Sequence, residues 1–181
     1  MKTLILYYSS HHGNTKKLVD AIVAQGNVTA VDVSAATVTD CSDYDMIGFA
    51  SGIYYQKFHE SILKWAEANL PQNKKVFFLY TCGVKRKNYA DAIKQIAESK
   101  KSKIQGCYGC LGFDTFGPFK LVGGIAKGHP NDEDISSAVN FFCGIKEKKT
   151  VSQSRTRSGA RTAPIPLHGK KSGNSSSSIN A

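Results

Sequence analysis

The sequence lacks any long run of apolar residues. No apolar stretch approaches the roughly 20 residues of a membrane-spanning helix. The apolar start of the chain, from Leu4 to Tyr8, is also too short for the apolar core of a signal peptide. We therefore expect a soluble protein of the cytoplasm that has no membrane partner.

The sequence lacks a disulfide framework, and its number of cysteines is odd. The five cysteines do not have the spacing of a small disulfide framework, which favours a reducing compartment. Cys107 and Cys110 have C-x-x-C spacing, but they fall in a predicted strand, where residues i and i+3 point to opposite faces. Because no second C-x-x-C and no nearby histidine pair accompanies them, we expect a structural role and no metal site.

Acidic residues are nearly absent from the end of the chain. Residues 146–181 hold eight of the 24 Lys and Arg but one of the 14 Asp and Glu, so they carry +7 of the net charge of +10. They are rich in Ser and Gly and poor in large apolar residues, a composition typical of disorder. We predict one domain over residues 1–145 and a disordered tail over 146–181. The tail is either a polyanion-binding arm or a functionally silent extension, and because its charges are spread out we expect no nucleic-acid partner.

Apolar runs alternate with amphipathic segments through residues 1–145. The runs are apolar on both faces, and helical patterns follow them, which is typical of a parallel sheet covered on both sides. Residues 34–45 are ambiguous. The predicted strands are 3–8, 28–33, 45–51, 74–81 and 103–113, and the predicted helices are 15–25, 59–70, 88–101 and one that begins at 131.

The polar stretch SSHHGNT, residues 9–15, joins the first predicted strand to the first predicted helix. Its hydroxyl and amide groups, its single glycine and the free N–H groups of the helix N-terminus together suit a phosphate. It matches neither the Walker A pattern nor G-x-G-x-x-G. The alternative is an ordinary capped turn. His11 and His12 have no acid or cysteine nearby, so we do not expect them to bind a metal.

Two further loops follow predicted strands and carry aromatic residues. In ASGIYYQKFH, residues 50–59, two tyrosines follow a small-residue turn, and they either lie against a planar ring or pack on neighbouring loops. In TCGVKRKNY, residues 81–89, the three consecutive cations are either part of a site or a solvated basic loop. Since ligands of open parallel sheets bind beyond the carboxyl ends of the strands, the three loops together predict a pocket for a mononucleotide with a flat ring.

The order of these loops resembles the flavodoxin family. SSHHGNT is similar to the FMN phosphate loop of that family, and GFASGIYYQKFHESI and GFDTFGPFKLVGGIAKGHPNDEDI are similar to segments of small prokaryotic flavodoxin-like proteins. The resemblance covers about residues 1–145. It implies an α/β three-layer sandwich with a five-stranded parallel sheet in the order 2-1-3-4-5. It also implies non-covalently bound FMN and electron transfer between redox partner proteins, a reductase and an acceptor, through the exposed edge of the ring.

The resemblance also implies which residues hold the cofactor. Three groups correspond to the phosphate loop and to the loops on the two faces of the ring. Phe113, Phe116 and Phe119 are expected to pack within the fold, with Phe116 also a possible pocket residue. No catalytic residue is implied. The cofactor-binding residues implied are Ser9, Ser10, His11, Gly13, Asn14, Thr15, Ser51, Gly52, Ile53, Tyr54, Thr81, Cys82, Gly83 and Tyr89.

One feature departs from the family pattern. Electron-carrier flavodoxins are typically acidic around the flavin, whereas residues 1–145 have a net charge of +3 and Lys85, Arg86 and Lys87 lie in a predicted flavin-facing loop. Positive charge stabilises reduced, anionic flavin, so we expect a raised reduction potential. It also attracts anionic partners, including the phosphates of pyridine nucleotides. An NAD(P)H-dependent FMN oxidoreductase of the quinone reductase type is therefore the alternative function.

Overall fold

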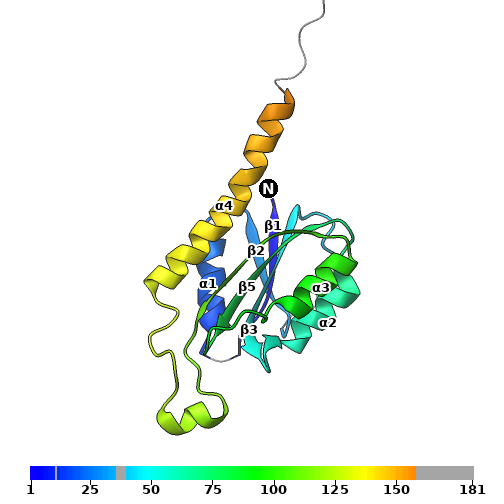
Figure 1. Cartoon of the computed structure of the whole chain (residues 1–181). Helices are drawn as coiled ribbons and strands as arrows, with labels where there is room; N and C mark the ends of the chain where they lie inside the picture. Colours follow the sequence, from blue (N-terminus) through cyan, green and yellow to red (C-terminus); the bar gives the residue numbers. More distant parts are fainter. Residues whose placement is uncertain (11, 36–39, 158–181) are drawn as a thin grey trace, which may run out of the picture.

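The computed structural model describes residues 1–10, 12–35 and 40–157, with side chains as far as residue 147. A central sheet lies between two layers of helices (Figure 1). The strands are β1 (Thr3–Tyr8), β2 (Val28–Asp32), β3 (Met46–Tyr54), β4 (Lys57–Phe58), β5 (Lys75–Cys82) and β6 (Lys103–Leu111). The helices are α1 (Asn14–Val23), α2 (Glu60–Asn69), α3 (Asp91–Ser99), the short 3-10 helix η1 (Gly117–Val122) and α4 (Asp132–Arg157).

The five long strands form a parallel sheet in the order β2-β1-β3-β5-β6. Counted without the short β4, this is the predicted order 2-1-3-4-5, so the predicted fold is confirmed. Strand β4 lies in a segment expected to be a loop. It forms because β3 continues to Tyr54 and the chain turns back at Tyr55 and Gln56, both with positive φ, to pair Ile53 with Phe58.

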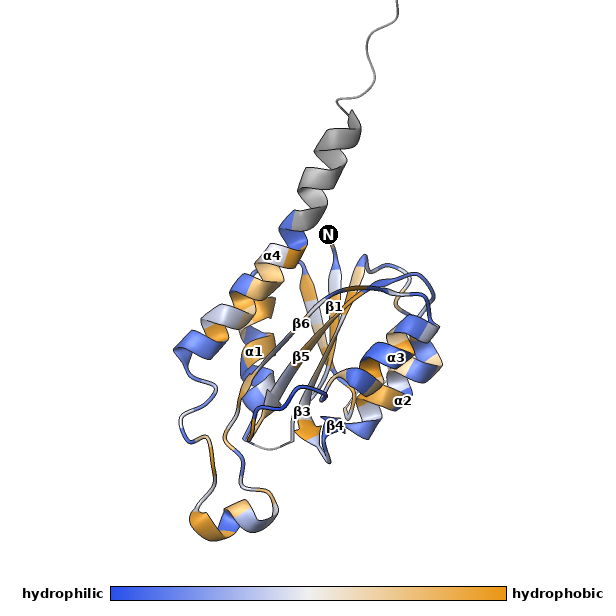
Figure 2. Cartoon of the chain, viewed as in Figure 1, coloured by the Kyte–Doolittle hydropathy of each residue, from blue (hydrophilic) through white to orange (hydrophobic). Residues whose placement is uncertain are grey.

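Alternate residues of each strand face opposite layers. Leu4 and Leu6 of β1 pack in a core with α2 and α3, whereas Ile5 between them packs in a second core with α1 and α4. The same alternation separates Phe78 from Phe77 and Leu79 in β5. Figure 2 shows the resulting pattern, with apolar helix faces toward the sheet and polar faces outward. This two-sided burial explains why the strands are apolar throughout.

Helix α4 begins as predicted and ends later than predicted. The Asn131 side chain accepts a hydrogen bond from the Asp134 N–H, and the Asp134 carboxylate accepts one from the Asn131 N–H, which caps the helix. The helix continues to Arg157, so residues 146–157 are helical where the sequence predicted disorder. Extending an existing helix costs less than starting one, and the segment begins with good helix formers. The rest of the predicted tail, 158–181, lies outside the described residues.

No helix in the described part of the chain is both long and apolar enough to cross a membrane. Of residues 34–45, which were ambiguous in the sequence, residues 34–35 and 40–45 are described and contain no helix.

Candidate functional site: a pocket at the carboxyl ends of the strands

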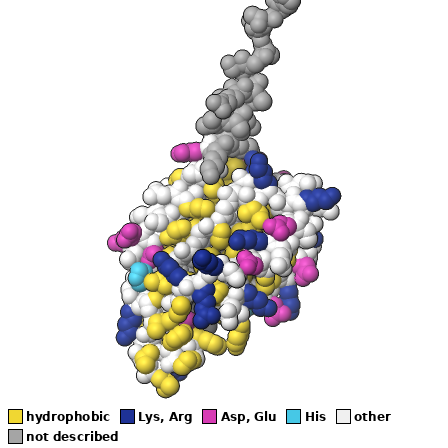
Figure 3. Space-filling model, in the orientation of Figure 1, with side chains coloured by type: hydrophobic (Ala, Val, Ile, Leu, Met, Phe, Trp, Pro, Cys, Tyr) yellow, Lys and Arg dark blue, Asp and Glu magenta, His cyan; other side chains and the backbone are white. Residues whose placement is uncertain are grey.

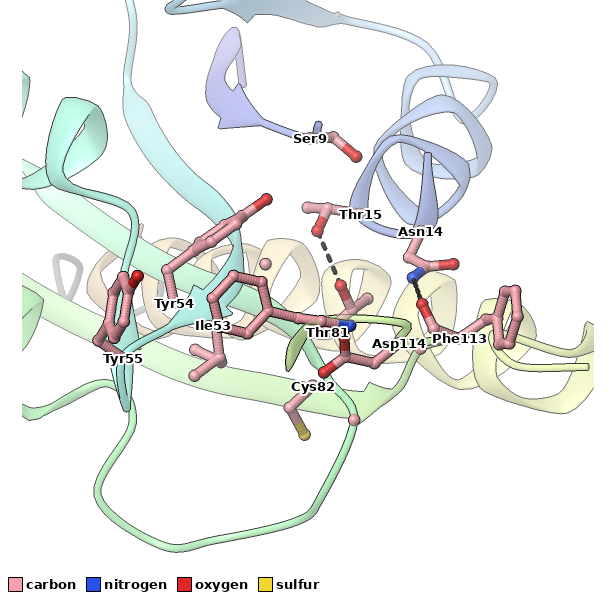
Figure 4. A pocket seen from close by; sticks show the side chains of 14 residues that line it. Ser9, Asn14, Thr15, Ile53, Tyr54, Tyr55, Thr81, Cys82, Phe113 and Asp114 are labelled. Carbon is pink, nitrogen blue, oxygen red and sulfur yellow. Dashed lines mark hydrogen bonds between the residues drawn. The ribbon is translucent and has the colours of Figure 1, made fainter. Parts of the chain in front are cut away.

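A pocket opens beyond the carboxyl ends of β1, β3, β5 and β6 (Figure 4). This edge lies where the strand order reverses around β1 and β3, the place at which open parallel sheets bind ligands. Four loops contribute to it, so residues from positions 9 to 116 come together. The lining residues are Ser9, Asn14, Thr15, Gly52, Ile53, Tyr54, Tyr55, Thr81, Cys82, Gly83, Gly112, Phe113, Asp114 and Phe116.

The first loop presents the N-terminus of α1 to the pocket. Gly13, the N-cap residue of α1, has a left-handed backbone with φ of 65° and no side chain that could cap the helix. Ser9 accepts a hydrogen bond from the Lys16 N–H over 3.3 Å, and the Thr15 hydroxyl lies 2.9 Å from the Thr81 hydroxyl at the end of β5. Free N–H groups at a helix N-terminus, with hydroxyls beside them, form a site for a phosphate.

Asn14 leaves an unsatisfied acceptor in this site. Its Nδ2 donates a hydrogen bond of 2.7 Å to the Phe113 carbonyl, whereas its Oδ1 is buried and has no hydrogen-bond partner among the described residues. A buried acceptor without a partner is costly, and such groups in native proteins are usually satisfied by a ligand or water. The hydroxyl groups of a ribityl chain are donors of the kind this oxygen needs. The residues therefore fit a flavin mononucleotide.

Hydrogen bonds and ring contacts outside the pocket fix the position of the second loop. Ser51 is fully buried, its hydroxyl donates to the Gly52 carbonyl, and it accepts a hydrogen bond from the His59 N–H at 2.9 Å. The Tyr54 hydroxyl lies 2.8 Å from the Ser10 hydroxyl, and its ring meets those of Tyr8 and His59 edge-on. Burial raises the pKa of Tyr54, so its hydroxyl keeps its proton. Ile53 and Tyr54 thus form one rigid wall of the pocket.

The third loop places Thr81, Cys82 and Gly83 in the lining. Burial raises the pKa of Cys82 to about 11, so it is a neutral thiol, and its Sγ donates weakly to the Cys110 carbonyl at 3.5 Å. Tyr89 has a structural role, because it is 6% exposed and its hydroxyl donates to the Val84 carbonyl at 2.8 Å.

A fourth segment, residues 112–116, completes the pocket and was not predicted apart from Phe116. Tyr55, Gly112 and Asp114 also lie in the lining without having been assigned to it, and Phe113, which was expected to pack within the fold, lines it too. Asp114 Oδ1 accepts a hydrogen bond from the Phe116 N–H at 2.8 Å. A methyl group added to Gly83 would lie 2.6 Å from Asp114 Oδ2, so only glycine permits this approach. The block GFDTFGPFK carried part of the family resemblance, and it was the available signal for these residues.

Most of the predicted cofactor residues lie in this lining. Four others support it instead: Ser10 and Ser51 bind loop residues, Gly13 sets the turn before α1, and Tyr89 packs behind the third loop. His11 lies outside the described residues. Lys85, Arg86 and Lys87 are exposed and do not line the pocket.

The C-x-x-C pair has the predicted orientation. Cys107 is exposed and Cys110 is buried, so the two thiols lie on opposite faces of β6, and all five cysteines are free. Among the described residues, no group of three or more His, Cys, Asp or Glu side chains is arranged to hold a metal ion.

The fold and the pocket define the class of the protein: a doubly wound α/β protein with a mononucleotide site at the switch of strand order. A family model described as a flavodoxin domain matches residues 5–113. An uncharacterized protein of Methanocaldococcus jannaschii is 38% identical over 147 residues, which cover 80% of this chain and 98% of that protein. The chain belongs to the flavodoxin family.

Solved structures show the same fold. A flavodoxin from the domain Archaea superposes with a TM-score of 0.58 at 17% identity, over 82% of this chain and 98% of that one. General stress protein 14 of Treponema denticola, in complex with FMN, gives a TM-score of 0.58 at 12% identity, over 81% of this chain and 99% of that one. With the family assignment, these findings support FMN as the cofactor, as predicted from the sequence.

Proposed function

We propose that this protein is an electron carrier that shuttles electrons between redox partner proteins through bound FMN. FMN supplies the redox chemistry, and the protein binds the cofactor, orients it and sets its electrostatic surroundings. The α1 N-terminus, Thr15 and Ser9 would hold the phosphate, Asn14 Oδ1 would accept from the sugar chain, and the loops around Tyr54 and Gly83 would flank the ring.

The observation that carries this proposal is the lack of acid–base machinery in the described lining. Its titratable side chains are two tyrosines, Cys82 and Asp114. Burial keeps Tyr54 and Cys82 protonated, and Asp114 accepts a hydrogen bond from its own loop. A general acid or base works best with a pKa near the operating pH, and neither Tyr54 nor Cys82 meets that condition. Transfer of electrons alone needs no such group.

The alternative is an NAD(P)H-dependent FMN oxidoreductase of the quinone reductase type. The exposed cations Lys85, Arg86 and Lys87 favour it, because they lie in the loop that continues from the pocket residue Gly83 and suit the phosphates of a pyridine nucleotide.

An absorbance spectrum of the purified protein, followed by addition of NADPH alone in air, separates the two functions. Flavin bands that stay oxidised support a carrier that needs a reductase. Rapid bleaching with continued NADPH oxidation supports the enzyme. A protein that contains no flavin and takes none up when FMN is added contradicts both.

A further inference from the structure

Two of the exposed large apolar side chains of the described residues belong to the pocket lining, and two others belong to η1 in the segment that follows it. Tyr55 and Phe116 line the pocket and are 83% and 52% exposed, and Leu121 is 89% exposed. Figure 3 shows apolar side chains at the end of the molecule that carries η1, with Lys and Arg side chains next to them. We call this set the apolar rim; it consists of Tyr55, Val84, Phe116, Leu121 and Val122.

Three residues of the apolar rim, Phe116, Leu121 and Val122, belong to one folded loop. Asp114 and Ile125 pair through two backbone hydrogen bonds of 3.1 and 2.8 Å, which close the base of the segment that carries η1. The Gly124 N–H donates to the Phe119 carbonyl at 2.7 Å, which fixes the end of η1. The rings of Tyr55 and Phe116 meet edge-on with centroids 5.8 Å apart, so the β3–β4 hairpin contacts this segment. A surface ordered before binding loses less entropy when a partner docks.

Positive charge surrounds the apolar rim. The loops that line the pocket, residues 9–13, 52–59, 83–90 and 112–131, contain six exposed cations and one acid, Asp114. Acids also begin the helices at this end, but Glu60 and Asp91 form salt bridges with lysines of their own helices, at 3.0 and 3.7 Å. Even with Asp132, Glu133 and Asp134 of α4 counted, the cations outnumber the acids. The cations are Lys57, Lys85, Arg86, Lys87, Lys120 and Lys127.

We propose that the apolar rim and its cations are the docking surface for a redox protein whose own contact patch is apolar and surrounded by carboxylates. This inference rests on the proposed function, since it names the class of partner that exchanges electrons with the bound FMN. Apolar centres with polar borders are the usual anatomy of protein interfaces, and complementary charge steers the encounter. The positive charge of this surface is opposite in sign to the charge of an acidic electron carrier, so such a carrier and this protein would select different partners.

A protein partner fits this surface better than a lipid bilayer does. Membrane-surface helices are long and amphipathic, whereas η1 has six residues and the rim is assembled from three separate loops. Tyr55 and Phe116 of the rim also line the pocket, so a protein docked here would bring its redox centre toward the cofactor. Binding to anionic vesicles is therefore the outcome that would replace this proposal.

The sign of the salt dependence tests the charge of the partner. The FMN-loaded protein, reduced anaerobically, is mixed with an excess of acidic plant plastocyanin or of basic cytochrome c. In each encounter one electron leaves the reduced flavin and reduces one Cu²⁺ or one haem Fe³⁺, and both acceptors have high potentials, so transfer is downhill. We expect the second-order rate constant with plastocyanin to fall at least tenfold between low and high salt, and that with cytochrome c to stay level or rise.

Two sets of variants test the surface itself. Replacing Lys120 and Lys127 with Gln should lower the plastocyanin rate constant about tenfold at low salt and flatten its salt dependence. Replacing Leu121 and Val122 with Ser should lower it by a similar factor at every salt concentration, since the lost contact is apolar. The control replaces Lys100 and Lys101 with Gln at the opposite edge of the sheet, which removes the same charge and should leave the rate constant within twofold.

The outcomes separate this inference from the proposed function. A rate with cytochrome c that falls with salt, or equal loss in the rim variants and the control, overturns the docking surface while electron transfer stands. Sedimentation of the protein with anionic phosphatidylserine vesicles, lost on replacing Leu121 and Val122, overturns it in favour of a membrane. No flavin binding, or no electron transfer to either acceptor, overturns the proposed function itself. Flavin absorbance of each variant confirms that it is folded and loaded.

Discussion

At the scale of single residues, His59, which lies beside the pocket wall, makes the stability of the fold depend on pH. Its Nδ1 accepts the Ser61 N–H at 3.2 Å as the cap of α2, and its ring stacks on Tyr8 with centroids 3.5 Å apart. Burial lowers the pKa of His59, against a smaller opposing effect of Glu60. As the pH falls, His59 therefore binds a proton in the unfolded chain before it does so in the folded protein. The contribution of His59 to the free energy of unfolding is complete above about pH 6.5 and is lost as the pH falls below that value.

We expect His59→Asn to flatten the dependence of stability on pH. Asparagine keeps a capping acceptor but does not titrate. Urea unfolding of the FMN-free protein at pH 7.5 and pH 5 measures the effect. The wild type should lose more free energy of unfolding than the variant over this interval. Equal losses in the two proteins would show that His59 does not couple folding to protons.

We expect one acid in the pocket and three cations beyond it to shift the flavin potential in opposite directions. Asp114 lines the pocket, whereas Lys85, Arg86 and Lys87 lie outside the lining. Because Coulomb energy falls with distance, Asp114→Asn should raise the FMN reduction potential, on the order of 50 mV, and replacing the three cations with Gln should lower it. Spectroelectrochemical titration of the loaded protein measures both. A potential unchanged in both variants would contradict the electrostatic argument.

At the scale of elements, the start of α4 depends on a reciprocal cap. Asn131→Ala removes the acceptor of the Asp134 N–H and should lower the free energy of unfolding by about 1 kcal/mol. Asn140→Ala is the matched control, because Asn140 is exposed in the same helix and alanine is a better helix former there. Urea unfolding compares the two, and equal effects would mean that the cap contributes nothing.

Some helices and strands could be predicted from the local sequence pattern, and others could not. Strands β1 and β5 and helices α1 and α2 follow from apolar runs and helical periodicity, to within one or two residues at each end. Strand β4 has no such pattern, because two residues are too short for one and the hairpin depends on positive φ at Tyr55 and Gln56. The end of α4 was missed because helix extension depends on the helix before it.

At the scale of the whole molecule, cofactor binding and folding are linked. A ligand that binds only the folded state stabilises it, by about 2.7 kcal/mol at one hundred times its dissociation constant. We expect FMN to raise the melting temperature of the FMN-free protein, and riboflavin at the same concentration to raise it much less, since it lacks the phosphate for the α1 N-terminus. Calorimetry measures both. Equal shifts would mean that the loop from Ser9 to Thr15 does not hold the phosphate.

The sequence by itself determined the alternation of strands and helices, and with it the sheet. The reason is that a strand buried on both faces needs a continuous run of apolar residues, which can be recognised locally in the sequence. It also indicated the loops at residues 9–15, 50–59 and 81–89, since each directly follows a strand. Only the tertiary structure decided that Asn14 meets Phe113 and that Asp114 lies against Gly83. The pairing of β5 with β6 and the folding back of residues 112–130 bring these groups together, and contacts so distant in sequence leave no periodic signal in a single chain.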